Sequence, residues 1–133
     1  MGIIRELMTV NPRTVQAGDS VVDAAKLMRD EDSGVAPVMD GRELVGVVTD
    51  RDIVVRVVAE GRDPATTRID EIASRNLVTV DPDQSFEEAL LLMARHHVHH
   101  LPVVEEDGRL IGVVTRDVVA RYASATPYAE IAE

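Results

Sequence analysis

One sequence unit occurs twice along this chain, and the duplication limits the possible folds more than any other feature. A displacement of 65 residues matches the first copy to the second, and after one extra residue in the second copy the displacement becomes 66. Identical residues then fall together in the pairs Ser20 and Ser85, Met28 and Met93, Pro37 and Pro102, Gly46 and Gly112, and Thr49 and Thr115. Shared helix or strand propensity does not explain coincident proline, serine and glycine residues. The sequence therefore predicts two similar units, residues 1–65 and 66–133.

Each copy predicts a strand, a helix, two strands joined by a tight turn, and a closing helix. Ser20 and Ser85 each precede apolar residues at helical spacing and are followed three positions later by an acidic residue, so both are expected to cap a helix. Gly34 is expected to end the first of these helices. The later elements are predicted as strands at 35–39, 44–49 and 110–115 and as closing helices at about 51–59 and 117–123.

Each copy also ends a β-branched strand with a hydroxyl residue and then opens a helix with charged residues. The sequences are GVVTDRDI, from Gly46 to Ile53, and GVVTRDV, from Gly112 to Val118. Free backbone N–H groups and the helix dipole favour a phosphate at such a helix start. Thr49 can donate a hydrogen bond to a phosphate and a carboxylate three residues later can accept two from a ribose, which indicates nucleotide binding. The alternative is a pair of first-turn carboxylates that only complement the helix dipole.

Composition excludes several classes of function. The net charge of −10 disfavours binding to nucleic acid or to anionic membranes. The chain has no cysteine, which excludes disulfides, zinc–thiolate sites and cysteine catalysis. No apolar run is long enough to span a bilayer and the N-terminus has no signal-peptide pattern, so we expect a cytoplasmic protein. No set of nucleophile, base and orienting residue is evident, so we do not expect an enzyme.

The histidines form one short cluster, since all four lie between His96 and His100. Such a cluster suggests a metal site, but its spacing matches none of the usual zinc motifs. The alternative is a helix end followed by a strand, in which neighbouring residues point to opposite faces. We therefore expect no metal, and place His99 near a bound phosphate.

The order of elements, the GVVTDRDI motif, the preceding Gly-Val-Ala-Pro-Val and the His-His-Leu-Pro-Val of the second copy together resemble the cystathionine-β-synthase (CBS) domain. Two in tandem look like a Bateman module, and the likeness is greatest to small stand-alone bacterial proteins of the stress or hypoxic-response type. The resemblance implies an α+β fold of two pseudo-symmetric units, each a small mixed sheet with two helices on one face. It also implies two clefts, an adenosine-containing ligand such as AMP, ADP or ATP, and a homodimer.

The resemblance assigns residues to both clefts. The first cleft would use Thr49, Arg51, Asp52, Val78, Thr79, Val98 and His99, and the second Arg13, Thr14, Ser33, Gly34, Val35, Thr115 and Arg116. The second copy departs from the pattern, because Val118 stands where the first has its aspartate. Asp117 comes one position early, about 100° around a helix, so the second cleft is not expected to hold a ribose.

The function that the sequence favours is a regulatory, non-catalytic module that senses adenosine nucleotides and signals to an unidentified protein partner. It requires no cofactor. The alternative is a constitutive structural or interaction dimer whose clefts stay empty.

Overall fold

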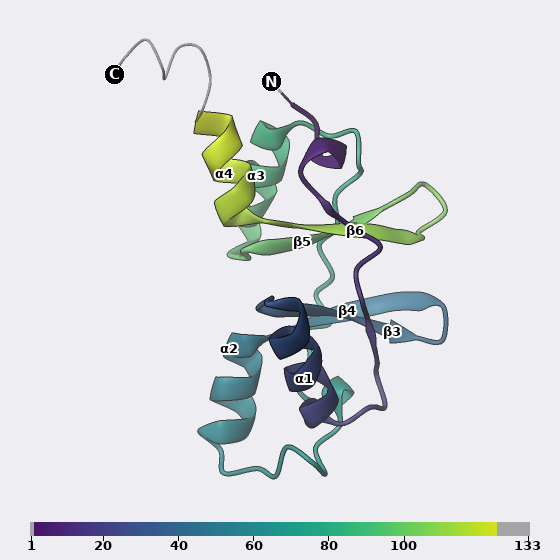
Figure 1. Cartoon of the computed structure of the whole chain (residues 1–133), viewed down its shortest axis with the longest axis vertical. Helices are drawn as coiled ribbons and strands as arrows, with labels where there is room; N and C mark the ends of the chain where they lie inside the picture. Colours follow the sequence, from purple (N-terminus) through teal and green to yellow (C-terminus); the bar gives the residue numbers. More distant parts are fainter. Residues whose placement is uncertain (1, 125–133) are drawn as a thin grey trace. The chain divides into compact units, whose positions relative to one another are not determined.

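The computed structural model describes residues 2–124, which divide into two compact units (Figure 1). The central unit consists of Arg13–Leu77. The terminal unit consists of the described residues before Arg13 together with those from Val78 onward. These units differ from the sequence copies 1–65 and 66–133, because the opening residues of each copy pack in the core of the other.

The central unit contains a mixed sheet in the order β2-β3-β4. Strand β2 (Val15–Gln16) is parallel to β3 (Val35–Asp40), and β3 forms an antiparallel hairpin with β4 (Glu43–Thr49). Ser74 extends the other edge of β4 through two backbone hydrogen bonds with Val47, of 3.0 and 3.3 Å. The predicted strands 35–39 and 44–49 are therefore confirmed.

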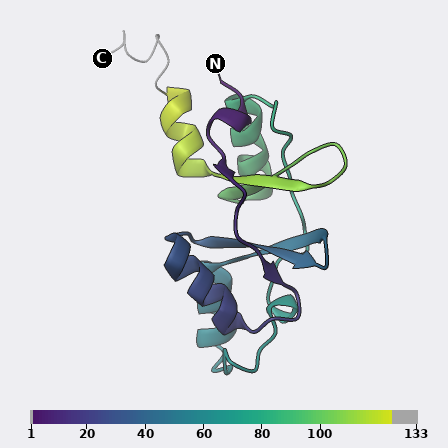
Figure 2. The same cartoon turned by 45° about the vertical axis from the view of Figure 1, so that its right-hand side comes forward.

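Two helices cover one face of this sheet (Figures 1 and 2). Helix α1 spans Val21–Glu31, and α2 (Asp50–Ile53) continues into the π-helical segment η2 (Val54–Val58). The short 3₁₀-helix η3 (Ile69–Glu71) closes the end of the unit. The buried side chains between these layers are Val15, Val21, Ala24, Leu27, Met28, Ala36, Val38, Val48, Val57, Ile69 and Ile72.

Helix α1 begins and ends differently from the prediction. The Ser20 side chain makes no capping hydrogen bond. The first two amides of the helix, those of Val21 and Val22, instead donate to the carbonyls of Thr67 and Pro64 at 2.9 and 3.3 Å. The helix ends before Asp32, whose φ of 49° is left-handed, so the expectation that Gly34 would end it is wrong.

The terminal unit repeats this plan. Its sheet has the order β1-β6-β5, and its elements are η1 (Ile4–Glu6), β1 (Thr9–Val10), α3 (Phe86–His96), β5 (His100–Val104), β6 (Leu110–Thr115) and α4 (Arg116–Ser124). Val80 forms a parallel bridge with Val103, as β2 does with β3, and makes the sheet mixed. The core residues are Ile4, Val80, Phe86, Ala89, Met93, Leu101, Val103, Val114 and Val119. The predicted α+β class, with two similar units of sheet and helices, is thus confirmed.

The predicted cap of α3 is present. The Ser85 hydroxyl accepts a hydrogen bond from the Glu88 amide at 3.1 Å, and Glu88 accepts one from the Ser85 amide at 3.2 Å. Within the described part of the chain, no helix combines the length and apolar character needed to cross a membrane.

Candidate functional site

The candidate site is centred on the junction where β4 runs into α2 in the central unit. Thr49, in an extended conformation, is the N-cap of α2. Its hydroxyl accepts a hydrogen bond from the Asp52 amide at 3.1 Å, and the Asp52 carboxylate accepts one from the Thr49 amide at 2.9 Å. This capping box satisfies two amides that the helix cannot pair internally. It also holds a hydroxyl and a carboxylate side by side at the helix start.

Both side chains keep capacity to bind a ligand while they cap the helix. A threonine hydroxyl that accepts one hydrogen bond can still donate its own proton, and an ionised carboxylate offers about four acceptor positions on two oxygens. Thr49 and Asp52 are each half-buried, so they are fixed by their surroundings and also reach the surface. The junction therefore presents one donor and one bidentate acceptor, a pair suited to a phosphate and a ribose diol.

Strand β3 enters the sheet beside this junction. Val35 lies opposite Thr49 in the hairpin, and the Asp50 amide donates to the Gly34 carbonyl at 2.9 Å. The Ser33 hydroxyl donates to the Val35 carbonyl at 3.1 Å, which fixes the entry of the strand. The structure therefore brings together, within one unit, residues that the resemblance divides between two clefts.

The remaining predicted residues of the central unit are arginines and a threonine at the start of β2 and in α2. Arg13 and Thr14 are exposed, and the Arg13 guanidinium lies 4.0 Å from the Glu31 carboxylate at the end of α1. Arg51, in the first turn of α2, is also exposed. These arginines supply positive charge in a chain whose net charge is −10.

The terminal unit contains an equivalent junction between β6 and α4. Thr115 lies opposite His100, and the Arg116 amide donates to the His99 carbonyl at 2.8 Å, as Asp50 does to Gly34. The half-buried Val118 occupies the position of Asp52 and has no group that accepts a hydrogen bond. This junction therefore has the hydroxyl of the first but lacks its carboxylate.

Three other predicted residues precede or enter strands of the terminal unit. Val78 and Thr79 are half-buried and lead into Val80, whose amide donates to the Pro102 carbonyl at 3.0 Å. Val98 is half-buried, and its amide donates to the Met93 carbonyl at 3.0 Å to close the end of α3. Val78 and Thr79 therefore lead into the sheet, whereas Val98 is held at the end of α3.

Sequence reasoning missed that Thr49 and Asp52 cap each other. The Thr-x-x-Asp spacing is itself the signal, because a capping box needs an acceptor at the first and fourth of these positions. It also missed the contact between Asp50 and Gly34. A Cβ atom on Gly34 would lie only 2.9 Å from a carboxylate oxygen of Asp50, so this carboxylate lies against the glycine.

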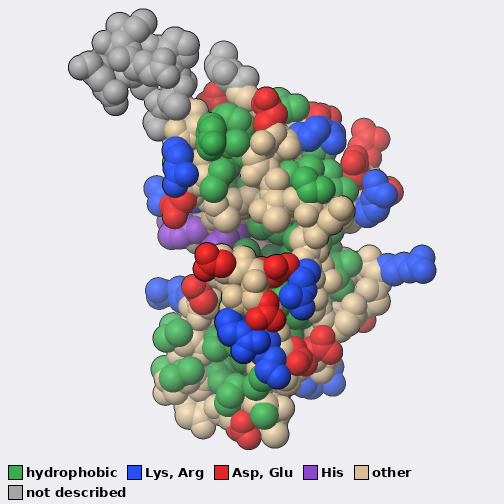
Figure 3. Space-filling view, viewed as in Figure 1, with side chains coloured by type: hydrophobic (Ala, Val, Ile, Leu, Met, Phe, Trp, Pro, Cys, Tyr) green, Lys and Arg blue, Asp and Glu red, His purple; other side chains and the backbone are tan. Residues whose placement is uncertain are grey.

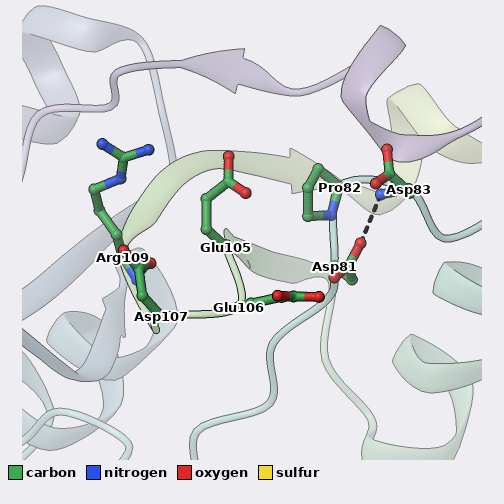
Figure 4. A pocket seen from close by; sticks show the side chains of 7 residues that line it. All are labelled: Asp81, Pro82, Asp83, Glu105, Glu106, Asp107 and Arg109. Carbon is green, nitrogen blue, oxygen red and sulfur yellow. Dashed lines mark hydrogen bonds between the residues drawn. The ribbon is translucent and has the colours of Figure 1, made fainter.

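Hollows outside these junctions include one in each unit of the described part of the chain. The larger, of about 430 Å³, is in the terminal unit and is lined by Asp81, Pro82, Asp83, Glu105, Glu106, Asp107 and Arg109 (Figure 4). The smaller, of about 150 Å³, is in the central unit and is lined by Ala17, Val38, Asp40, Val45, Asp70, Ala73, Ser74 and Arg75. Five carboxylates around the larger hollow disfavour a phosphate there.

The surface charges are mixed in sign. Figure 3 shows acidic and basic side chains interspersed on the face of the central unit, and four of the five ion pairs found among the described residues join neighbours within that unit. A nucleic-acid interface needs a continuous basic stripe. On the face drawn in Figure 3, the charged side chains of the central unit do not form such a stripe.

A family model described as the CBS domain matches residues 4–59 and again residues 69–125. The chain belongs to the CBS domain family. The CBS domain-containing protein YhcV of Bacillus subtilis is 38% identical over 114 residues, which cover 86% of this chain and 80% of YhcV. Hypoxic response protein 1 of Mycobacterium tuberculosis is 37% identical over 123 residues, which cover 92% of this chain and 85% of the relative. The predicted tandem pair of CBS domains is confirmed, as is its resemblance to small bacterial CBS proteins.

Solved structures of CBS pairs have the same fold. The crystal structure of hypoxic response protein I with two coordinated zinc ions has a TM-score of 0.79 and 36% identity, covering 90% of this chain and 98% of that one. The crystal structure of CBSX2 in complex with AMP has a TM-score of 0.76 and 28% identity, covering 92% and 96%. Among the described residues of this chain, no three histidine or carboxylate side chains are grouped to hold a metal ion.

Proposed function

We propose that this CBS pair is a regulatory module that binds an adenosine nucleotide, such as AMP, ADP or ATP, and performs no catalysis. The observation that carries the proposal is the capping box, which holds the Thr49 hydroxyl and the Asp52 carboxylate together at the start of α2. The AMP complex of the relative CBSX2 supports the ligand class. Dedicated catalytic groups are not needed for this function.

In this proposal each side chain has a separate task. Asp52 accepts two hydroxyl groups of the ribose, Thr49 donates to a phosphate, and the exposed Arg51 neutralises phosphate charge. In the family pattern, the second sequence repeat also contributes residues to this cleft, namely Val78, Thr79, Val98 and His99. A second cleft lacks the carboxylate that would accept ribose hydroxyls, so we propose that it binds no ribose. Its residues are Arg13, Thr14, Ser33, Gly34, Val35, Thr115 and Arg116.

We propose that ligand binding is signalled by a change in the packing of two protomers against each other. Val54 and Val58, on η2 directly after the ligand motif, are 58% and 67% exposed. We propose that these valines are covered in a homodimer. A ligand bound at Asp52 would then change the packing of η2, which forms part of the dimer interface. A ligand shifts such an equilibrium only by its differential affinity for the two states. Light scattering at micromolar concentration tests the dimer, and a monomeric mass would contradict it.

Thermal unfolding with and without ligand tests the proposed function. AMP, ADP, ATP, NAD and S-adenosylmethionine are each added, and GMP serves as the base-specificity control. A ligand at about 100 times its dissociation constant stabilises the folded state by about 2.7 kcal/mol, which raises the melting temperature measurably. An unchanged melting temperature with every adenosine compound would favour the constitutive dimer with empty clefts.

A further inference from the structure

The two strand-to-helix junctions are built alike, but their helices begin with residues of opposite charge. In the central unit the Asp50 amide donates to the Gly34 carbonyl, and in the terminal unit the Arg116 amide donates to the His99 carbonyl. An acid beside a glycine in one unit therefore corresponds to a base beside a histidine in the other. The same backbone hydrogen bond is present at both junctions, so the difference lies in the side chains.

The negative charge of Asp50 has a fixed place. Its Oδ1 accepts a hydrogen bond from the Arg51 amide at 2.8 Å. A Cβ on Gly34 would lie 2.9 Å from its Oδ2, which shows that the carboxylate lies against the glycine. The Asp50 side chain is exposed, as is that of Arg51, but the hydrogen bond to the Arg51 amide holds its carboxylate at the start of the helix.

This charge lies beside the proposed ligand. Asp50 follows Thr49 directly in sequence, so their Cα atoms are about 3.8 Å apart. Any phosphate that Thr49 binds is then within a Debye length, about 10 Å at 0.1 M salt, of the Asp50 carboxylate. Asp52 adds a second negative charge at the same helix start.

We propose that Asp50 is a selectivity residue that makes this junction discriminate against adenosine ligands with additional phosphate groups. The inference rests on the proposed function, since it names the ligands that the Thr49 and Asp52 junction prefers. Repulsion grows with the number of phosphate charges, so Asp50 penalises ATP more than AMP and leaves adenosine unaffected.

Calorimetric titration with adenosine, AMP and ATP, in low salt and with EDTA to remove divalent cations, tests the inference on the full chain. Asp50→Asn keeps the acceptor for the Arg51 amide and removes only the charge. We expect the variant to bind adenosine within about twofold of the wild type, AMP about threefold more tightly and ATP about tenfold more tightly. The gains should shrink as salt is added, because salt screens the repulsion.

The matched control is Asp107→Asn. Asp107 is also exposed, and its Oδ1 also accepts a hydrogen bond from a nearby backbone amide, that of Arg109 at 3.0 Å. It lies in the turn of the other unit, at the end of β6 away from Thr115. We expect this variant to change none of the three affinities.

Two results would overturn the inference. Equal changes for adenosine, AMP and ATP in Asp50→Asn would show that the residue acts on the structure and not through charge. Equal gains in Asp107→Asn would show that only net charge matters. If the wild type binds none of the three compounds, the proposed function itself fails and the inference fails with it.

Discussion

Thr49 and Asp52 each hydrogen-bond the backbone amide of the other, at 3.1 and 2.9 Å. The residue proposed to hold the ribose is therefore also part of a helix cap. A substitution at this position has a structural effect and a ligand effect, and the two can be separated by choosing side chains that keep or lose the acceptor.

Asp52→Ala should reduce both stability and binding, whereas Asp52→Asn should reduce binding alone. Alanine loses the hydrogen bond from the Thr49 amide, although the backbone amide of residue 52 still donates to the Thr49 hydroxyl, and the loss of one such bond costs about 0.5–1.5 kcal/mol of unfolding free energy. Asparagine keeps an oxygen that accepts from the Thr49 amide, so its melting temperature should stay close to that of the wild type. Both lose charge-assisted hydrogen bonds to the ribose, and AMP should bind roughly 10- to 100-fold more weakly. Urea unfolding and AMP titration of each variant measure the two effects.

Asp117→Ala is the control, because Asp117 is exposed and one position away from the equivalent of Asp52. It should bind AMP like the wild type. If Asp52→Asn also binds AMP like the wild type, the ribose assignment is wrong and the carboxylate is only a cap.

Ser85→Ala should destabilise the protein and Ser20→Ala should not. The Ser85 hydroxyl accepts from the Glu88 amide at 3.1 Å, and loss of such a cap costs typically about 1 kcal/mol. The Ser20 side chain makes no capping bond, since backbone carbonyls of Pro64 and Thr67 serve the first amides of α1. Urea unfolding of both variants measures the difference. Equal losses for the two serines would contradict the structure of the α1 start.

This pair of serines shows why local pattern predicts only part of the structure. Both precede a helix and have an acid three positions later, so both read as caps. The difference arises from a loop more than 40 residues further along the chain, which brings the Thr67 carbonyl to the start of α1. No short motif contains that information.

More of the fold than of the site could be predicted from the sequence. The repeat, the strands and the closing helices followed from periodicity and from matching positions, which are local properties. The packing of Ile4 in one unit and of Ile69 in the other depends on tertiary contacts and was not predicted. At the site, the spacing of Thr49 and Asp52 could be recognised in the sequence. The contact of Asp50 with Gly34 could not, because it joins two separate elements.

Acid should weaken the cap of α3. The hydrogen bond from the Ser85 amide, followed by those from Gln84 and the Ser85 hydroxyl, lowers the pKa of Glu88 below its ordinary value. A carboxyl whose pKa is lower in the folded state stabilises the protein above its unfolded pKa, about 4.3 for glutamate, and this stabilisation is lost as the pH falls through the folded pKa.

Urea unfolding of the wild type and of Glu88→Gln across pH 7 to pH 3 measures this effect. The wild type should be the more stable at pH 7, and the two should converge as the pH falls through the lowered pKa of Glu88 in the folded state. Glu87→Gln, in the same turn but outside the capping box, is the control and should show no such convergence. A difference between the wild type and Glu88→Gln that does not change with pH would contradict the charged cap.

The wild type should bind about one adenosine nucleotide per chain, and Val118→Asp should raise this number toward two. Val118 lies three residues after Thr115, the same spacing that lets Asp52 and Thr49 cap each other. An aspartate there would supply both a cap partner for Thr115 and the missing ribose acceptor. Calorimetric titration with AMP gives the stoichiometry of both proteins.

Val118→Asn is the matched control, because it offers the cap without the charge, and its stoichiometry should remain near one. Two equivalent sites in the wild type would show that Asp117 already serves the second junction, and an unchanged stoichiometry in Val118→Asp would show that a carboxylate at this spacing is not sufficient for ribose binding.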